Sequence, residues 1–224
     1  MTGKKLPLAF AVVVFAAAII GVLAPGAVAG NGKTKCGSVP APPAGSTVTG
    51  GLEVDGTCIL VDVTVNGGVV VDSTGALSQQ GGTISGGITV DPGGELDLNA
   101  STNGSGFPSG TTSTVNGGVT INGALDTDLW AARINGGLTV NTSGGFVQIC
   151  GNDVTGDSSI SGAFGTIGVG GFFGCNGNTF RSSLSLTNSA LTFGGNTIGK
   201  NLLCTNSVVF VTAPNTIGGT NTCY

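Results

Sequence analysis

The stretch INGGLTVN, residues 134–141, has close copies along this chain, most with two glycines at the centre and an Asn or Asp at the end. Among them are VNGGVVVD from Val65, ISGGITVD from Ile84 and VNGGVTIN from Val115. Most segment starts are about 19 residues apart, and they fall at Val48, Val65, Ile84, Val115, Ile134, Val154, Phe180, Ile198 and Ile217. A repeat of this length with alternating apolar residues predicts a solenoid, whose stacked coils bury one continuous core.

Three apolar positions of the repeat share one parity. Positions one, five and seven are Ile134, Leu138 and Val140 in the quoted copy. Because side chains of one parity point to one face of a strand, these positions predict interior columns. Position six is expected to face solvent and holds, in three consecutive copies, Thr89, Thr120 and Thr139. We therefore expect an all-β chain, built as a single-stranded parallel β-helix with coils of about 19 residues.

The bends between strands also have a sequence signature. Position eight is a turn-forming residue in nearly every copy and predicts a corner at Asp55, Asp72, Asp91, Asn122, Asn141, Ser161, Thr187 and Thr205. Glycine pairs such as Gly136-Gly137 predict a second bend, where a Cβ has no room. From Val48 to Cys223 the period and pattern resemble those of parallel β-helix proteins, and the resemblance implies a right-handed coil in preference to a left-handed one.

The N-terminus reads as a secretory signal peptide over residues 1–29. Lys4 and Lys5 precede an apolar run from Leu6 to Leu23, and a small-residue site, Ala27-Val28-Ala29, follows. An uncleaved anchor is the alternative, since such a run is just long enough to span a bilayer. Cleavage predicts a secreted, extracellular protein without a membrane segment. Residues 30–47 are then a linker or cap, and residues 48–224 form the β-helix, with an insertion loop at 100–114.

Six cysteines, an even number, predict disulfides in an extracellular protein. Cys204 and Cys223 both occupy position seven, so they should be stacked neighbours about 4.8 Å apart, within the range that a disulfide accepts. Cys150 and Cys175 are likewise one coil apart, which leaves Cys36 with Cys58. Such bridges would fasten both ends of the solenoid, where strand edges are open.

Composition excludes several function classes. The chain contains no histidine, which removes Ser-His and Cys-His nucleophile pairs, and it has no zinc or P-loop motif. Between Lys35 and Arg133 there is no basic residue, while nine of the eleven acidic residues lie there. Nucleic acid is therefore not an expected partner, because phosphate binding needs a basic face. Divalent cations or neutral glycans on a cell surface fit this charge distribution better.

Four carboxylates occupy equivalent places in two neighbouring coils. Glu95 and Asp97 lie at the same offsets from Ile84 as Asp126 and Asp128 do from Val115. We expect the neighbouring Leu96, Leu98, Leu125 and Leu129 to point inward, so that all four acids point outward, with Glu95 beside Asp126 and Asp97 beside Asp128. Four carboxylates this close repel one another unless something offsets their charge. A calcium ion could bind them, or two of them could share a proton, which raises one pKa and makes that group suitable as a general acid.

Trp130 has the same outward parity as the acids, and the insertion leaves the helix between the same two coils. Acids, an aromatic ring and a loop suggest a glycan site in which Trp130 stacks on a sugar, with Arg133 as the only basic residue near it. In the other interpretation the acids only keep the surface soluble, and Trp130 is buried under the insertion.

The leading functional interpretation is a secreted structural, adhesive or surface-associated module without enzymatic activity. The alternative is a calcium-dependent polysaccharide-binding protein, or a polysaccharide lyase or hydrolase, that uses the acidic residues; β-helical enzymes of this kind bind substrate on such a face. Ice binding through the position-six threonines is a third interpretation, although Glu53 and Val70 interrupt that column.

Overall fold

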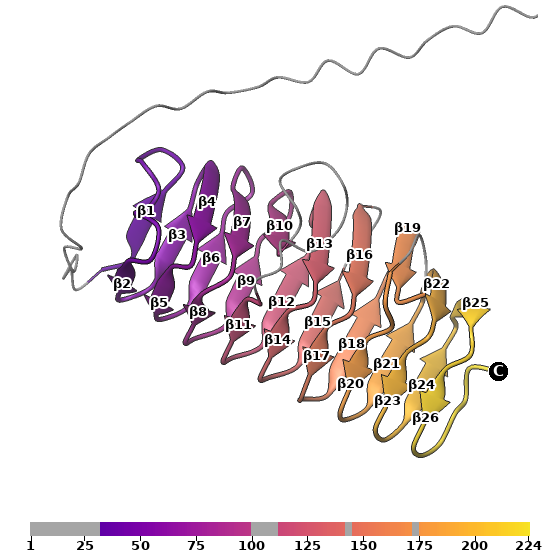
Figure 1. The fold of residues 1–224 in the computed structure, drawn as a ribbon. Helices are drawn as coiled ribbons and strands as arrows, with labels where there is room; N and C mark the ends of the chain where they lie inside the picture. Colours follow the sequence, from indigo (N-terminus) through magenta and orange to yellow (C-terminus); the bar gives the residue numbers. More distant parts are fainter. Residues whose placement is uncertain (1–31, 100–111, 142–144, 172–174) are drawn as a thin grey trace, which may run out of the picture.

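The computed structural model describes residues 32–99, 112–141, 145–171 and 175–224, and these residues form a parallel β-solenoid (Figure 1). Every strand pairing is parallel, and the described residues contain no helix. The solenoid has about nine turns with a period of about 19 residues, which confirms the predicted fold class. The predicted signal peptide and most of the predicted insertion lie outside the described residues.

Three sheets run the length of the solenoid, and each complete coil gives one strand to each sheet. Sheet A consists of β2 (Thr47–Thr49), β5 (Thr64–Asn66), β8 (Thr83–Ile84), β11 (Thr114–Val115), β14 (Arg133–Ile134), β17 (Asp153–Val154), β20 (Thr179–Phe180), β23 (Thr197–Ile198) and β26 (Thr216–Ile217). Sheet B consists of β1 (Thr34–Cys36), β3 (Leu52–Val54), β6 (Val69–Val71), β9 (Ile88–Val90), β12 (Val119–Asn122), β15 (Leu138–Asn141), β18 (Ser158–Ser161), β21 (Leu184–Thr187) and β24 (Leu202–Thr205). Sheet C consists of β4 (Thr57–Val61), β7 (Ala76–Gln80), β10 (Glu95–Leu98), β13 (Asp126–Trp130), β16 (Phe146–Cys150), β19 (Phe164–Val169), β22 (Ala190–Gly194) and β25 (Val208–Ala213).

The register of these sheets follows the repeat. Position one lies in sheet A, where Val115 pairs with Ile134, and positions five to eight lie in sheet B, where Thr120 pairs with both Thr89 and Thr139. The position-one, five and seven side chains are almost all buried and form one core along the axis. Thr114, expected in the insertion, instead begins β11, and residues 34–36, expected in the linker, form β1.

The glycine pairs make the bend between sheets A and B, as predicted. A Cβ added to Gly136 would lie 2.6 Å from the backbone carbon of Gly117 in the preceding coil, so the coils approach too closely there for any side chain. At the other corner, the Asn141 amide donates to Asn122 over 3.2 Å. The left-handed backbone conformation falls one residue beyond this Asx column, at Gly123, Gly162, Asn188 and Asn206.

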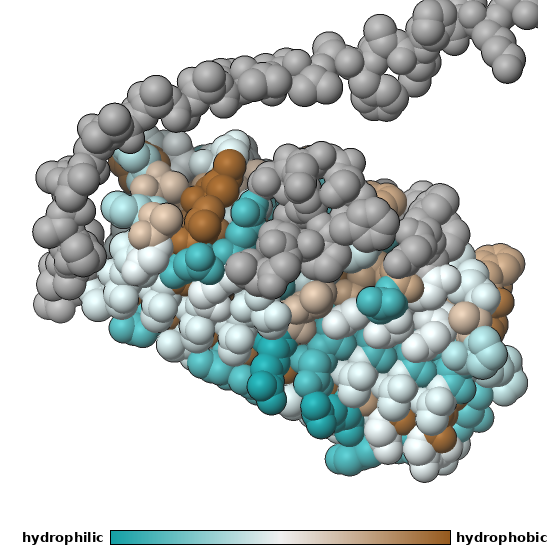
Figure 2. Space-filling model, in the orientation of Figure 1, coloured by the Kyte–Doolittle hydropathy of each residue, from teal (hydrophilic) through white to brown (hydrophobic). Residues whose placement is uncertain are grey.

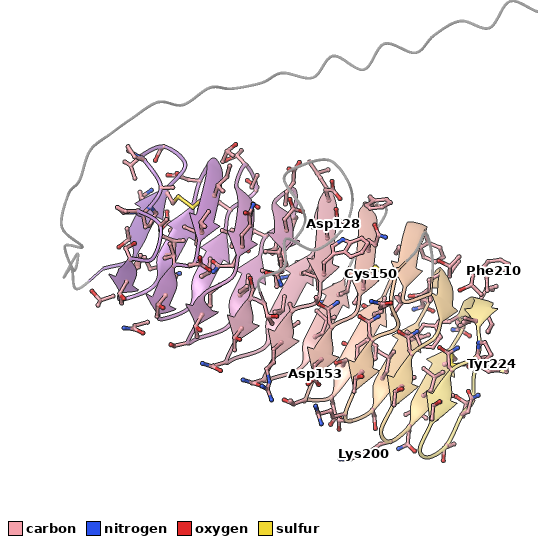
Figure 3. The ribbon with its side chains drawn as sticks, viewed as in Figure 1. Asp128, Cys150, Asp153, Lys200, Phe210 and Tyr224 are labelled. Atoms are coloured by element: carbon pink, nitrogen blue, oxygen red, sulfur yellow. A yellow bond between two sulfur atoms is a disulfide. The ribbon has the colours of Figure 1, made fainter. Side chains whose placement is uncertain are left out.

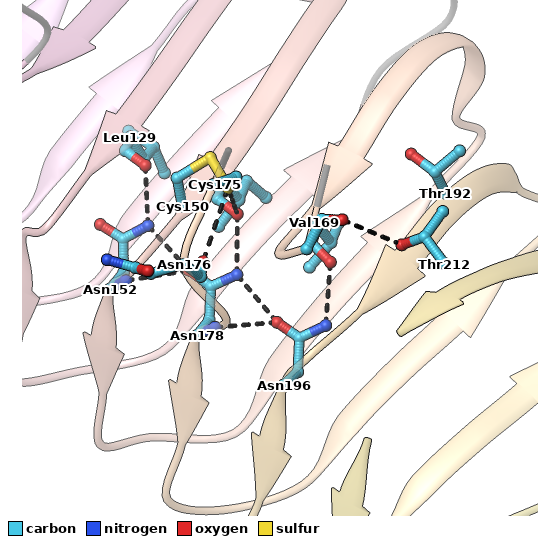
Figure 4. Close-up of a disulfide and its surroundings, with 12 residues drawn as sticks. Leu129, Cys150, Asn152, Val169, Cys175, Asn176, Asn178, Thr192, Asn196 and Thr212 are labelled. Carbon is cyan, nitrogen blue, oxygen red and sulfur yellow. Dashed lines mark hydrogen bonds between the residues drawn. A yellow bond between two sulfur atoms is a disulfide. The ribbon is translucent and has the colours of Figure 1, made fainter. Parts of the chain in front are cut away.

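A second asparagine ladder, which the repeat pattern did not predict, lies inside the C-terminal half (Figure 4). The backbone N–H of Asn152 donates to Asn178 Oδ1 over 2.9 Å, and the N–H of Asn178 donates to Asn196 Oδ1 over 2.9 Å. Each amide also donates to a carbonyl of sheet C, as Asn178 does to Ile149 over 2.7 Å. These buried side chains therefore satisfy backbone groups at the turn from sheet C to sheet A.

All three predicted disulfides are present. Cys36–Cys58, Cys150–Cys175 and Cys204–Cys223 have Cα–Cα distances of 5.5, 5.3 and 5.0 Å. Disulfides of this kind are consistent with an extracellular location. No helix in the described part of the chain is long and apolar enough to cross a membrane.

Candidate functional site

The outer face of sheet C carries most of the exposed large apolar side chains of the described residues. Six of the eleven such side chains point outward from its strands: Ile59, Val61, Phe146, Phe164, Val208 and Phe210. Sheet A instead shows mainly threonine on its outer face. Figure 2 shows brown, apolar atoms over β4 at one end of this face, next to teal, polar ones. Apolar surface gathered on one face indicates a binding surface.

The four predicted carboxylates lie together in the middle of this face. Glu95 on β10 pairs in register with Asp126 on β13, and Asp97 pairs with Asp128, as the repeat predicted. Leu96 and Leu98 point into the core between them and are 1% and 0% exposed. The four acids therefore form two adjacent columns on neighbouring strands.

One of the expected inward residues was assigned wrongly. Leu125 is 63% exposed, and Thr127 takes the buried place opposite Leu96, with 0% exposure. The reason is that β13 begins at Asp126, so Leu125 lies in the turn before the strand, where parity no longer determines direction. The buried hydroxyl of Thr127 has no hydrogen-bond partner, which makes this coil less well satisfied than its neighbours.

Burial and mutual repulsion raise the pKa values of these acids. Partial burial, followed by the charges of Asp126 and Glu95, raises the pKa of Asp97 to about 6. Partial burial, followed by Asp126 and Asp97, raises the pKa of Asp128 to about 7. Burial also raises the pKa of Asp126. The site therefore holds protons near neutral pH, because burial disfavours the charged form and because neighbouring carboxylates resist ionising together.

A shallow hollow of about 330 Å³ lies between these acids and β4. Its shape follows from residue size, because β7 presents only the small side chains of Ala76 and Ser78 between larger neighbours. Ile59, 48% exposed, lines the β4 side, and Glu95 and Asp97 line the other. The hollow thus combines one apolar and one acidic wall.

Trp130 lies at the end of β13 but is not an open stacking platform. It is 7% exposed and packs in a small apolar cluster with Cys150 and Cys175. Cys150 is in register beside it on β16, so the disulfide lies against the indole. In the structure the exposed aromatic side chains of sheet C are Phe146, Phe164 and Phe210, which the sequence interpretation did not single out.

Arg133 does not join the acidic residues. It lies on β14 in sheet A, beside Asp153 on β17, and Asp153 accepts from Arg181 Nε and Nη2, each over 2.7 Å. These three residues border a separate open hollow of about 400 Å³ (Figure 3 labels Asp153). The basic residue proposed for the glycan site therefore belongs to another face.

The described residues contain no group of three or more His, Cys, Asp or Glu side chains arranged to hold a metal ion. Calcium binding by Glu95, Asp97, Asp126 and Asp128 stays a prediction that rests on their stacking alone.

Sheet A carries a threonine column that the sequence interpretation missed. In-register pairing along this sheet aligns Thr47, Thr64, Thr83, Thr114, Arg133, Asp153, Thr179, Thr197 and Thr216. The signal was the residue just before position one, which is threonine in seven of the nine copies.

No protein-family model, no curated protein and no solved structure matches this chain.

Proposed function

We propose that this protein is a secreted, non-catalytic adhesive module that binds an extracellular glycan through the outer face of sheet C. The observation that carries the proposal is the presence, on that one face, of exposed apolar side chains together with the acidic hollow, which Ile59 lines and beside which Phe146 pairs with Asp126. A regular solenoid supports the proposal because it presents such a face rigidly over many coils.

The chemistry of the face favours a neutral polysaccharide. Phenylalanine rings such as Phe146 offer flat apolar surfaces to the C–H faces of sugar rings, and carboxylates such as Glu95 accept hydrogen bonds from hydroxyl groups. Acidic polymers would be repelled, because nine acidic and no basic residues lie between Lys35 and Arg133.

A glycan array, run with calcium and with a chelator, tests this proposal. We expect retention on one or more neutral glycans, and Ile59→Ser should weaken it by about tenfold, since Ile59 walls the hollow. Val39→Ser is the matched control, because Val39 is 45% exposed against 48% for Ile59 but lies outside sheet C. Equal losses in the two variants, or no retention of the unaltered protein, would reject the proposal. Loss of glycan binding only in the presence of the chelator would indicate that the four carboxylates bind calcium.

Ice binding is a second candidate, and the threonine column of sheet A favours it. Runs of four and of three threonines, each at spacings of about 4.8 Å, place hydroxyl and methyl groups in regular arrays on a rigid face. The column is longer than the position-six column on which that hypothesis first rested, although Arg133 and Asp153 interrupt it.

Thermal hysteresis of the freezing point tests this second candidate. Thr83→Lys would place a long charged side chain in the unbroken N-terminal half of the column and should abolish the hysteresis. Thr120→Lys, on the outer face of sheet B, should leave it unchanged. Absence of hysteresis in the unaltered protein removes the candidate.

A further inference from the structure

The two ends of the solenoid differ in how completely their strands are covered. At the N-terminal end, β4 is the last strand of sheet C, yet its inward residues Cys58 and Leu60 are both 0% exposed. At the C-terminal end, β25 is the last strand of the same sheet, and its inward residue Val211 is 47% exposed. Val211 pairs with the fully buried Phe193, so the core is closed at one end and open at the other.

The N-terminal end is closed by residues 37–45, which run beside β4. Gly37 packs so closely on Gly56 that a Cβ would lie 2.3 Å from its nitrogen, and the N–H of Gly45 donates to Val61 over 3.0 Å. Between these contacts the segment contains Pro40, Pro42 and Pro43. Proline has no N–H to donate, so this segment does not present a further pairing edge.

The C-terminal end is closed only at sheet B. There the tail runs beside β24: the N–H of Leu202 donates to Thr220 over 2.9 Å, and Cys223 is bonded to Cys204. Sheet A ends in the two-residue strand β26. Sheet C ends in the six-residue strand β25, and the described residues place no strand beyond it.

Over its first four residues, Val208 to Val211, the open strand pairs in regular register and lacks the usual protection against pairing, because its bulge falls only at Thr212. Its sequence is VVFVTA, with Val208 56% and Phe210 60% exposed, and no side chain after Lys200 is charged. Figure 3 shows Phe210 at this end of the molecule. Edge strands are normally blocked by charge, proline or a bulge. The partly buried apolar residues that pack on the core all belong to this last coil as well: Cys204, Val209, Ile217 and Cys223.

We propose that β25 pairs antiparallel with β25 of a second copy, so that two solenoids join at their C-terminal ends into a closed dimer. A second copy fits because β25 is largely apolar and carries no charged side chain, so that two copies of this strand meet without electrostatic repulsion. Head-to-tail stacking is blocked, because the N-terminal end presents prolines in place of an edge. In this pairing the outward-facing residues of the two strands lie on the same side of the joined sheet, so the two sheet C faces become one. The inward-facing Val209 and Val211 of each copy would then extend the core across the interface.

Sedimentation velocity over the micromolar range tests the dimer, without any glycan, so its result is independent of the proposed adhesive function. We expect a reversible monomer–dimer equilibrium and no larger species. Phe210→Lys should raise the dissociation constant by about a hundredfold, because two like charges would face each other across the two-fold axis. Leu203→Lys is the control: Leu203 is exposed in the same coil, but its strand edge is covered by the tail.

A protein that stays monomeric throughout, a dimer equally weakened in both variants, or open-ended polymers would each overturn the proposal. Circular dichroism establishes that the variants are folded. If Phe210→Lys does not fold, Val208→Lys places the charge at the start of the same strand and tests the same prediction.

Discussion

Asp97 on β10 lies directly beside Asp128 on β13, and burial raises the pKa values of these two carboxyl groups to about 6 and about 7. In the unfolded chain both groups ionise near the ordinary aspartate pKa of 3.8. The folded protein therefore holds protons that the unfolded chain has already lost, and the pair links stability to pH.

The first prediction is that the free energy of unfolding falls as pH rises from near 3.8 to about 7 and then levels off. At low pH the two carboxyl groups are protonated in both the folded and the unfolded chain, so they do not change stability. At high pH they are ionised in both, and their charges destabilise the folded protein to the full extent. Asp128→Asn should flatten this dependence and raise stability at neutral pH. Denaturant unfolding at a series of pH values measures it.

Three other carboxyl groups do not disturb this pH window. The pKa values of Asp55, Asp153 and Asp157 are lowered, mainly by hydrogen bonds from Ser38, Arg181 and Ser182 respectively. The stability that these groups contribute is therefore lost only as pH falls below the ordinary aspartate pKa of 3.8. A stability that rises steadily across the window in the unaltered protein would contradict the assignment of raised pKa values to Asp97 and Asp128.

The second prediction concerns the buried asparagine ladder. Asn178→Ala removes the acceptor of the Asn152 N–H and the donor to the Ile149 carbonyl. Leaving these buried groups unpaired should cost about 3 kcal/mol of unfolding free energy. Urea unfolding measures the loss. Asn116→Ala, in the exposed pair with Asn135, should cost less than about 0.5 kcal/mol, and equal costs would show that the inner ladder is not a special source of stability.

The third prediction tests the glycine bend. Gly136→Ala would put a Cβ 2.6 Å from backbone atoms of the preceding coil, which only a shift of the backbone can relieve. We expect a loss of about 3 kcal/mol, measured by denaturant unfolding. Gly68→Ala is the matched control, since its nearest contact would be 3.4 Å away. If the two variants are equally stable, close coil packing does not explain the glycine pairs.

The sequence predicted the architecture because a solenoid repeats one local pattern. Alternation at Ile134, Leu138 and Val140 identified the buried columns, and the same register placed Cys204 beside Cys223. Each coil contacts only its neighbours, so a correct local register also gives the long-range contacts.

The candidate site was predictable only in part. Register correctly placed Glu95 beside Asp126, but it did not show that the strand begins after Leu125 or that a disulfide lies against Trp130. The exposure of Phe146 depends on how neighbouring residues cover the outer face of its strand, which the alternation pattern does not predict. Threonine precedes position one in seven of the nine copies, but the apolar alternation that defines the repeat begins one residue later and does not indicate this column.

The most direct measurement of the central claim compares two variants that remove equally exposed apolar side chains from different sheets. Phe146 in sheet C and Leu203 in sheet B are each 39% exposed. On the neutral glycan that retains the unaltered protein, we predict that Phe146→Ser loses about tenfold in affinity while Leu203→Ser binds unchanged. Unchanged binding by folded Phe146→Ser, or an equal loss in Leu203→Ser, would contradict the assignment of sheet C as the binding face.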